Sequence, residues 1–408
     1  MNKNNKHKLI PKLRFPEFQN AGEWEVKKVG DILVESKIPL KINDLEKRIT
    51  VRLNLKGVEK REYRGTESEN ATYFFERKKG QFIYGKQNLH KGAFGIIPEE
   101  LDGYASSQDL PAFDFKNGFF PKFFLHYLSQ ETVYPELEKI ATGTGSKRIH
   151  PKEFYNVSIP VPSLPEQQKI ASCLSSLDEV ITGEQQKLEL LKQHKKGLLQ
   201  NLFPQEGETV PKLRFKEFEN SGEWEVKRLG EVCEINPSIS KLPKEFIYID
   251  LESVKDGQLF QTKKISIDNA PSRAQRLLRK NDIIFQMVRP YQRNNLLFNL
   301  DGFNYVASTG YAQLRTSQSP EFLYYQLHTD FFVFRVLEKC TGTNYPAINT
   351  EELTKIEVFV PSLPEQQKIA SCLSSLDEII TAQTQKIEQL QRHKKGLLQG
   401  LFPNINNE

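Results

Sequence analysis

The chain has 408 residues, a formal net charge of +5, 38 % hydrophobic residues and 11 % aromatic residues. This is an ordinary globular composition, which argues against a disordered or fibrous protein, and the length predicts two to four domains. The mild positive charge suits an anionic partner but does not require one. No apolar run has the length of a signal peptide or of a membrane span, so we expect a cytoplasmic protein.

The chain repeats itself. The segment Pro11–Gly30, which ends in Gly-Glu-Trp-Glu-Val-Lys-Lys-Val-Gly, recurs with few changes as Pro211–Gly230. The segment Val161–Glu179 recurs without any change as Val360–Glu378. The sequence therefore contains two copies of one unit of about 200 residues, whose borders are alike and whose interiors differ.

Each copy begins with a border that holds one of the two tryptophans, Trp24 or Trp224. Because the two lie at matching positions, we expect them to be core anchors rather than ligand contacts. In the interiors, short β-prone runs such as Phe82–Tyr84 and Asp282–Phe285 alternate with Gly and Asn, which predicts strands and turns. The apolar spacing of Phe119–Leu128 and Phe322–Leu337 predicts an amphipathic helix in each copy. Each interior is therefore a mixed α+β domain.

Each copy ends in a predicted helix of about 38 residues. Ser163 and Glu166 fit a capping box at its start in the first copy, and Pro204 lies just past its end. Apolar residues alternate at spacings of three and four, which is typical of a coiled-coil seam. The seam residues are Ile170, Leu174, Leu177, Ile181, Leu188 and Leu191 in the first helix and Ile369, Leu373, Leu376, Ile380, Ile387 and Leu390 in the second.

Polar residues interrupt this seam at Glu184 and Lys195, and at Gln383 and Lys394. Burial of two long apolar stripes favours pairing of the two helices, and a two-fold relation between the copies makes them antiparallel. The polar interruptions would help to fix their register. The alternative is a bundle with the helices of a partner.

A search for catalytic motifs is negative. The segment Gly143–Lys147 lacks the spacing of a phosphate-binding loop, and no His/Cys cluster predicts a metal site. The cysteines Cys173, Cys233, Cys340 and Cys372 are too scattered for a metal pair or a disulfide framework. What remains are loops rich in basic, amide and aromatic side chains, which suit base and phosphate contacts but also occur on ordinary polar surfaces.

With its borders, variable interiors and long helices, the chain resembles the specificity (S) subunit of type I restriction–modification systems. The resemblance rests on Lys12–Phe15 with Gly22-Glu23-Trp24, on Pro160–Ile170, on the Thr142-Gly-Thr144 and Thr341-Gly-Thr343 turns, and on the second copies of the borders. It covers nearly the whole chain.

This resemblance implies an α+β fold with two target recognition domains, related by a pseudo-two-fold axis and separated by two long antiparallel helices that form a coiled coil. The expected parts are recognition domain 1 (1–160), a central spacer helix (161–204), recognition domain 2 (205–359) and a distal spacer helix (360–408). Each recognition domain would read one half of a bipartite DNA site.

The resemblance also implies that the chain is not an enzyme and holds no cofactor or metal. Two modification subunits would bring S-adenosylmethionine and methylate adenine, and restriction subunits would bring ATP and Mg²⁺. The alternatives are an adaptor that binds modification subunits without reading DNA, and an enzyme with an unrecognised site. By analogy, the expected DNA-binding residues are Lys86, Asn88, His90, Lys91, Ser107, Lys147 and Arg148 in the first domain, and Arg273, Arg276, Arg289, Tyr291, Arg293, Asn294, Ser308 and Thr309 in the second.

Overall fold

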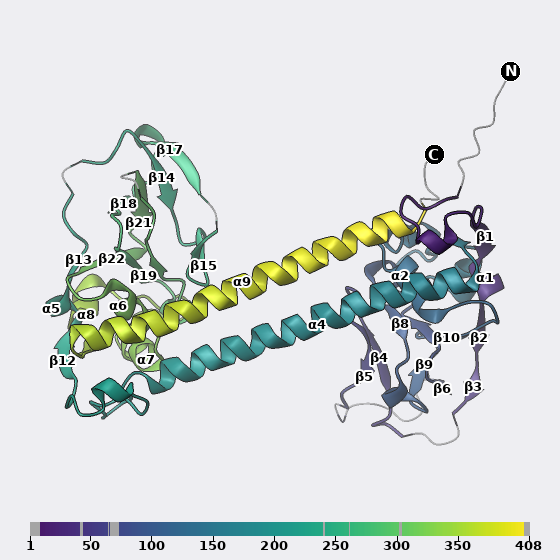
Figure 1. The fold of residues 1–408 in the computed structure, drawn as a ribbon, viewed down its shortest axis with the longest axis horizontal. Helices are drawn as coiled ribbons and strands as arrows, with labels where there is room; N and C mark the ends of the chain where they lie inside the picture. Colours follow the sequence, from purple (N-terminus) through teal and green to yellow (C-terminus); the bar gives the residue numbers. More distant parts are fainter. Residues whose placement is uncertain are drawn as a thin grey trace. The chain divides into compact units, whose positions relative to one another are not determined.

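The computed structural model describes residues 9–40, 44–63, 65, 73–239, 241–260, 262–301 and 304–403. They form two compact units: unit 1 is made of residues 1–185 together with 386–408, and unit 2 is the continuous segment 186–385. Each unit combines one body with a part of each long helix, α4 (Leu164–Asn201) and α9 (Leu363–Leu401), as Figure 1 shows. These helices have 38 and 39 residues, which confirms the predicted length.

The body of unit 1 is a mixed α+β domain, as predicted. Its strands are β1 (Glu25–Lys28), β2 (Leu33–Ser36), β3 (Ile38–Pro39), β4 (Ile49–Arg52), β5 (Gly57–Lys60), β6 (Phe74–Glu76), β7 (Phe82–Tyr84), β8 (Phe94–Ile96), β9 (Ala105–Ser107), β10 (Ala112–Phe115) and β11 (Ser158–Val161). Its helices are α1 (Val29–Ile32), α2 (Pro121–Leu128) and α3 (Pro151–Phe154), with 3-10 turns η1 (Pro16–Phe18), η2 (Leu89–Lys91), η3 (Glu99–Leu101) and η4 (Pro135–Ile140).

The central sheet of unit 1 has the order β2-β10-β7-β8 and is antiparallel throughout. A second sheet has the order β3-β6-β9, β4 and β5 form a hairpin, and β1 pairs with β11 directly before α4. The core beneath the central sheet is rich in aromatic rings: Phe82 lies 5.1 Å from Phe124 and Tyr84 lies 5.7 Å from Phe113, centroid to centroid. The predicted strand at residues 82–84 and the predicted helix that became α2 are both confirmed.

The body of unit 2 repeats this frame with additions. Its strands are β12 (Glu225–Arg228), β13 (Cys233–Ile235), β14 (Glu245–Ile249), β15 (Val254–Lys255), β16 (Gln258–Leu259), β17 (Lys263–Ser266), β18 (Ala274–Leu277), β19 (Ile283–Gln286), β20 (Leu296–Leu297), β21 (Tyr305–Ser308), β22 (Tyr311–Thr316) and β23 (Glu357–Val360). Its helices are α5 (Leu229–Val232), α6 (Pro320–Gln326), α7 (Asp330–Glu338) and α8 (Thr350–Lys355), with η5 (Lys216–Phe218), η6 (Ile267–Asn269) and η7 (Pro290–Gln292).

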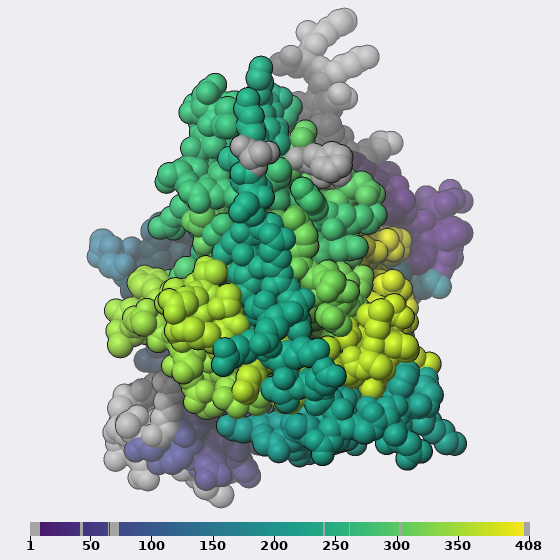
Figure 2. Space-filling model, turned by 90° about the vertical axis from the view of Figure 1, so that its left-hand side faces the viewer, coloured from purple at the N-terminus to yellow at the C-terminus, as the bar shows by residue number. Residues whose placement is uncertain are grey.

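The sheet β13-β22-β19-β20 of unit 2 has the same pattern as the central sheet of unit 1. A separate sheet with the order β17-β14-β21-β18 includes one parallel pair, β14 with β21. Strand β12 pairs with β23 just as β1 pairs with β11. In Figure 2 the teal segment that contains β12 lies beside the lime segment that contains β23.

One helix prediction in unit 2 is wrong. The apolar run Phe322–Leu337 was expected to be a single helix, but it forms two, α6 and α7. The break lies at Thr329, whose hydroxyl accepts a hydrogen bond from the amide of Phe332 at 3.2 Å and caps α7. A capping side chain outweighs periodicity here, because it satisfies an otherwise unpaired amide at a new helix start.

The two helix segments within each unit run antiparallel. In unit 1, Asp178 on α4 pairs with Lys394 on α9, and Glu184 on α4 pairs with Lys386 on α9. The residue number therefore increases along α4 where it decreases along α9. In unit 2, Lys195 Nζ lies 2.6 Å from Asp377 Oδ1. Three of the four polar seam positions, Glu184, Lys195 and Lys394, therefore take part in ion pairs between helices.

The seam is not used evenly along its length. Ile170 and Leu174 in unit 1, and Ile369 and Leu373 in unit 2, join the core of their own body. Of the remaining positions, Ile181, Leu376 and Ile387 are buried, whereas Leu177, Leu188, Leu191, Ile380 and Leu390 are half-buried.

The end of each helix completes the body of the other repeat's unit. In unit 1, Phe402 packs between Trp24, Phe123 and Tyr127, with ring centroids 6.1, 5.3 and 5.7 Å away. In unit 2 the equivalent Phe203 lies 6.2 Å from Trp224 and 5.2 Å from Phe322. Both tryptophans are 3 % exposed, which confirms them as core anchors.

Candidate nucleic-acid interface

Three segments of unit 1 meet at one surface, which we call surface A: the turn 85–92 after β7, the turn 107–110 before β10 and the loop 142–148. The amide of Lys86 donates to the carbonyl of Asp109 at 3.0 Å, and the amide of Ile149 donates to the carbonyl of Lys86 at 2.8 Å. The loop is closed by two hydrogen bonds of 2.8 Å between Thr142 and Arg148. Main-chain bonds thus fix three distant segments against each other.

Unit 2 builds an equivalent surface B from residues 286–294, 308–311 and 341–347. The amide of Met287 donates to the carbonyl of Gly310 at 3.0 Å, and the amide of Ile348 donates to the carbonyl of Met287 at 3.1 Å. Two hydrogen bonds between Thr341 and Ala347, at 2.9 and 3.0 Å, close its loop. These four main-chain hydrogen bonds therefore recur at equivalent positions in the two surfaces, although the side chains differ.

A glycine follows the first threonine of each closing loop. Gly143 has φ +113° and Gly342 has φ +89°, a region that L side chains rarely adopt. A Cβ at either position would also lie 3.2 Å from a carbonyl oxygen, of Ser146 or of Tyr345. The glycine of the Thr-Gly-Thr sequence is therefore required by the backbone of the loop, which explains its presence in both copies.

On surface A, the structure brings together Lys86, Ser107 and Arg148 around Asp109. Arg148 Nη1 lies 3.1 Å from Asp109 Oδ1, and the amide of Asp109 donates to Ser107 Oγ at 3.3 Å. Lys147 is exposed, with its Nζ 3.7 Å from a carboxylate oxygen of Glu138. Both basic side chains of this loop thus lie beside acidic ones.

A buried arginine supports the 107–110 turn from within. Arg77 is 1 % exposed. It donates from Nε to Ser106 Oγ at 2.7 Å and from Nη2 to the carbonyl of Leu110 at 3.2 Å. Burial lowers the pKa of Arg77 to about 10. This side chain holds the turn in place from the protein side.

The other predicted residues of unit 1 lie on or next to η2. Asn88 precedes η2 and accepts hydrogen bonds at its carbonyl from the amides of Lys91 and Ala93. Lys91 is exposed, whereas His90 is half-buried, and its Nδ1 has no hydrogen-bond partner among the described residues. The adjacent Leu89 is fully buried. Its side chain therefore fixes the turn to the core, and Asn88, His90 and Lys91 lie next to this fixed point.

Surface B carries a different set of side chains. The guanidinium of Arg289 lies over the ring of Tyr345, with Cζ 4.2 Å from the ring centroid. Tyr291 is 49 % exposed and Tyr345 is 63 % exposed. Surface B therefore presents Arg289 and two aromatic rings. On a frame with the same main-chain hydrogen bonds, surface A has a lysine, Lys86, and the ion pair of Arg148 with Asp109.

Arg293, predicted as a base contact, is tied into the protein. Its Nη1 donates to the carbonyl of His328 at 2.9 Å, and its Nη2 pairs with Asp330 at the start of α7. His328 also lies beneath this turn, and burial lowers its pKa to about 4. The amide of Asn294 donates to Gln286 Oε1 at 3.1 Å. These contacts give Arg293 a part in holding the turn against α7.

The remaining predicted residues of unit 2 lie along β18 and β21. The amide of Thr309 donates to the carbonyl of Arg273 at 2.8 Å, which places the exposed Arg273 at the edge of surface B. Ser308 is 4 % exposed, and its Oγ accepts from the amide of Gly310 at 3.2 Å, as Ser107 does in unit 1. Arg276 is half-buried, and burial lowers its pKa.

Sequence reasoning missed Tyr345. The signal was available, because the second closing loop, Thr341–Ala347, aligns with the first, Thr142–Arg148, from which Lys147 and Arg148 were chosen. Sequence reasoning also missed Asp109. A search for residues that bind an anion selects basic and amide side chains, and therefore passes over a carboxylate.

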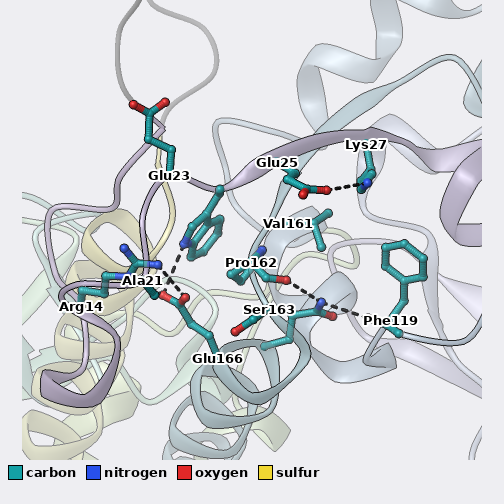
Figure 3. A pocket seen from close by; sticks show the side chains of 13 residues that line it. Arg14, Ala21, Glu23, Glu25, Lys27, Phe119, Val161, Pro162, Ser163 and Glu166 are labelled. Atoms are coloured by element: carbon teal, nitrogen blue, oxygen red, sulfur yellow. Dashed lines mark hydrogen bonds and ion pairs between the residues drawn. The ribbon is translucent and has the colours of Figure 1, made fainter.

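A second shared arrangement joins each border to its long helix, and we call it the border latch. Arg14 donates from Nε and Nη2 to Glu166, both at 2.8 Å, and Trp24 Nε1 lies 3.3 Å from the same carboxylate. Figure 3 shows Arg14 and Glu166 turned toward each other, with Glu23 pointing away, at a pocket of about 350 Å³. Arg214, Glu365 and Trp224 repeat these contacts in unit 2.

The capping box predicted for Glu166 is wrong. Its carboxylate, which is 1 % exposed, turns to Arg14 and Trp24 instead of to the amide of Ser163. A bidentate charged partner stabilises a buried carboxylate more than one neutral amide does. The carboxylate in turn raises the pKa of Arg14 through their hydrogen bonds.

Comparison with known proteins identifies this architecture. The family model of the type I restriction modification DNA specificity domain matches residues 21–193 and again 221–392. The chain belongs to this family. Each match covers one interior together with most of its long helix, and so includes surface A or surface B.

Several type I specificity subunits are similar in sequence. The MjaVIII specificity subunit of Methanocaldococcus jannaschii is 28 % identical over 281 residues, which cover 64 % of this chain and 65 % of that protein. The MjaIX subunit of the same organism is 24 % identical over 69 % of this chain and 68 % of its own length. The EcoDI subunit of Escherichia coli is 23 % identical over 62 % of each chain. The chain thus spans slightly less than two thirds of the MjaVIII subunit.

Solved structures share the fold. The crystal structure of the type I restriction–modification S subunit from M. genitalium matches with a TM-score of 0.60 at 17 % identity, over 98 % of this chain and all of that one. A chain from a study of complex assembly and conformational transition of the type I R-M system matches with a TM-score of 0.55 at 19 % identity, over 93 % and 98 %.

Two further searches cover the described part of the chain only. None of its helices is both long and apolar enough to cross a bilayer. Within the same residues, no three His, Cys, Asp or Glu side chains are grouped so that they could hold a metal ion.

Proposed function

We propose that this member of the specificity family selects the DNA sequence for a type I restriction–modification complex. Each body reads one half of a bipartite site, unit 1 through surface A and unit 2 through surface B. The observation that carries the proposal is the pair of matching frames with unlike side chains. A frame kept constant while its exposed residues change suits two readers of two different half-sites, and hence an asymmetric site.

The chemistry of the two surfaces supports DNA as the ligand. Lysine and arginine contact phosphates, arginine pairs with guanine, and asparagine pairs with adenine in the major groove. Surface A offers Lys86, Asn88 and Lys91, and surface B offers Arg289, Tyr291 and Arg273 at its edge. Main-chain bonds hold these turns in place, so little ordering is required when DNA binds.

We further propose that the chain is a non-catalytic subunit. Two modification subunits dock on the helical segments and supply S-adenosylmethionine and adenine methylation, and restriction subunits supply the ATP- and Mg²⁺-dependent cleavage. Outward-facing apolar residues on the helices suit such docking: Val180 is 48 % exposed and the equivalent Ile379 is 50 % exposed.

The decisive experiment is to co-express the full chain with a cognate modification subunit in a host that lacks adenine methylation. Genomic DNA is then sequenced by a single-molecule method that detects N6-methyladenine. We expect methylation at one bipartite motif with two different halves. A chain that binds modification subunits yet directs methylation to no motif would be an adaptor, and the proposal would be wrong.

A further inference from the structure

The stacked pair of Arg289 and Tyr345 is a distinctive feature of surface B. The guanidinium lies over the ring at 4.2 Å, where it gains from the quadrupole of the ring and loses rotamer freedom. Stacking uses the face of the guanidinium. The N–H donors at its edge therefore remain directed away from the ring.

The backbone fixes both members of the pair. Arg289 has φ +55° and ψ +54°, a left-handed conformation that is uncommon for a residue with a Cβ. Its amide donates to the carbonyl of Pro346 at 2.7 Å, and its carbonyl accepts from the amide of Gln292 at 3.0 Å. Arg289 is therefore bonded directly to the residue that follows Tyr345. Such local strain, when it is held by surrounding bonds, tends to occur at functional sites.

Arg289 also differs from the other arginines of unit 2 that have structural roles. Arg293 pairs with Asp330, Arg315 pairs with Asp282, and Arg335 lies 3.6 Å from Glu357. Among the described residues, no carboxylate or carbonyl pairs with the side chain of Arg289. A half-buried, oriented and unneutralised guanidinium is prepared for a ligand that is not part of the chain.

We propose that Arg289, positioned by Tyr345, reads a guanine in the half-site recognised by unit 2. A planar guanidinium edge donates two parallel hydrogen bonds, which match the O6 and N7 acceptors of guanine in the major groove. This inference rests on the proposed function, because it names the base that surface B selects. Surface A has no equivalent stacked arginine. Its Arg148 pairs with Asp109, and the residue equivalent to Tyr345 is Ser146.

The test uses the full chain in complex with a cognate modification subunit and a pool of DNA duplexes of random sequence. Bound duplexes are sequenced, and the base preference is calculated for each position. In Arg289→Ala and Arg289→Lys we expect the guanine preference at one position of one half-site to fall by on the order of ten-fold or more. Lysine keeps the charge but cannot form the bidentate pair.

Variants of Tyr345 separate positioning from structure. We expect Tyr345→Ala to weaken the guanine preference at the same position, and Tyr345→Phe to retain it because the ring is kept. Arg335→Ala is the matched control, since Arg335 also lies over an aromatic ring, that of Phe331 at 5.2 Å, and has a carboxylate nearby. Arg335→Ala should leave every base preference unchanged. Circular dichroism and thermal melting check that each variant folds.

The outcomes are distinct. An unchanged guanine preference in Arg289→Ala would overturn the inference. Equal weakening for all sequences in Arg289→Ala, with recovery in Arg289→Lys, would make Arg289 a phosphate contact and would also overturn it. A wild-type complex with no base preference at any position would instead show that the proposed function is wrong.

Discussion

Arg14 and Arg214 carry a positive charge into their units, where each pairs with a glutamate that also accepts a hydrogen bond from a tryptophan. The side chains of Arg14 and Glu166 are 7 % and 1 % exposed, and the same values hold for Arg214 and Glu365. Charges with so little solvent exposure are tolerated only when they are paired and hydrogen-bonded. The border latch therefore fixes the first turn of each long helix to its body, and it does so identically in both units.

Substitution of Glu166 should test this role. In Glu166→Gln the charge of Arg14 stays buried without a counter-ion, so we expect the free energy of unfolding of unit 1 to fall by about 3–5 kcal/mol. Urea unfolding followed by tryptophan fluorescence measures it. Glu17→Gln is the control, because Glu17 pairs with Lys169 at the surface, and an exposed ion pair contributes little to stability. Equal effects of the two variants would contradict a special role for the buried pair.

The sequence predicts which residues are buried better than it predicts their hydrogen-bond and ion-pair partners. The burial of Trp24 and Trp224 followed from their repetition, but the partner of Glu166 did not, because Arg14 lies 152 positions away and a local capping pattern offered a simpler partner. Composition predicted loops at residues 84–91 and 289–295, and the structure has the turns η2 and η7 there, whereas their contact with DNA stays a prediction. Which side chains there are neutralised by carboxylates, such as Arg148 and Arg293, depends on tertiary contacts that composition does not reveal.

At the scale of elements, the long helices combine apolar packing with ion pairs between α4 and α9. Lys195 pairs with Asp377 in unit 2, and Lys394 pairs with Asp178 in unit 1. The Asp377 carboxylate also accepts a hydrogen bond from the hydroxyl of Tyr325 at 2.8 Å, so the register of the helix segments is linked to α6. Shifting one helix by a turn would separate all of these pairs at once.

A charge placed in the seam should weaken this packing. Leu376 is 7 % exposed, whereas Ile379, one turn later, is 50 % exposed. We expect Leu376→Asp to lower the free energy of unfolding of unit 2 by about 3–5 kcal/mol, because an unpaired charge is buried. Ile379→Asp should stay within about 0.5 kcal/mol of the wild type. Thermal melting of the two variants measures the difference in their stability. Similar melting temperatures for Leu376→Asp and Ile379→Asp would contradict the assignment of Leu376 to the seam.

Periodicity predicted the long helices well, because 38 residues offer many repeats of one pattern. It failed for Phe322–Leu337, where the apolar spacing continues through the cap at Thr329 that separates α6 from α7. The separate four-stranded sheet of unit 2 was not predicted strand by strand, because strands of four or five residues such as β14, β17 and β18 contain too few alternations to give a clear period.

At the scale of the whole molecule, neither repeat supplies a complete unit. Unit 1 takes its body from the first repeat and residues 386–408 from the second, while unit 2 takes residues 186–201 of α4 from the first. The core of unit 1 includes Leu401 and Phe402, and the core around Trp224 includes Leu202 and Phe203. The sequence predicted two equivalent domains, but an exchange of helix ends cannot be read from a pattern that is the same in both copies.

Two matched substitutions test this exchange. Phe402→Ala lies in the second repeat, yet it should destabilise unit 1 by about 3–5 kcal/mol because it removes the ring that packs on Trp24. Phe203→Ala lies in the first repeat and should destabilise unit 2 by a similar amount. Hydrogen exchange measured by mass spectrometry locates each effect. Loss of protection in the repeat that carries the substitution, instead of the other one, would contradict the exchange.

The discontinuity of unit 1 also sets the order in which the protein matures on the ribosome. Residues 1–185 emerge first, but the segment that covers Trp24 emerges only after all of unit 2 has been translated. At 5–20 residues per second this interval is roughly 10–40 s. All residues of unit 2 are therefore available before unit 1 can be completed, and the body of unit 1 keeps an open apolar face until the last turn of α9 is synthesised.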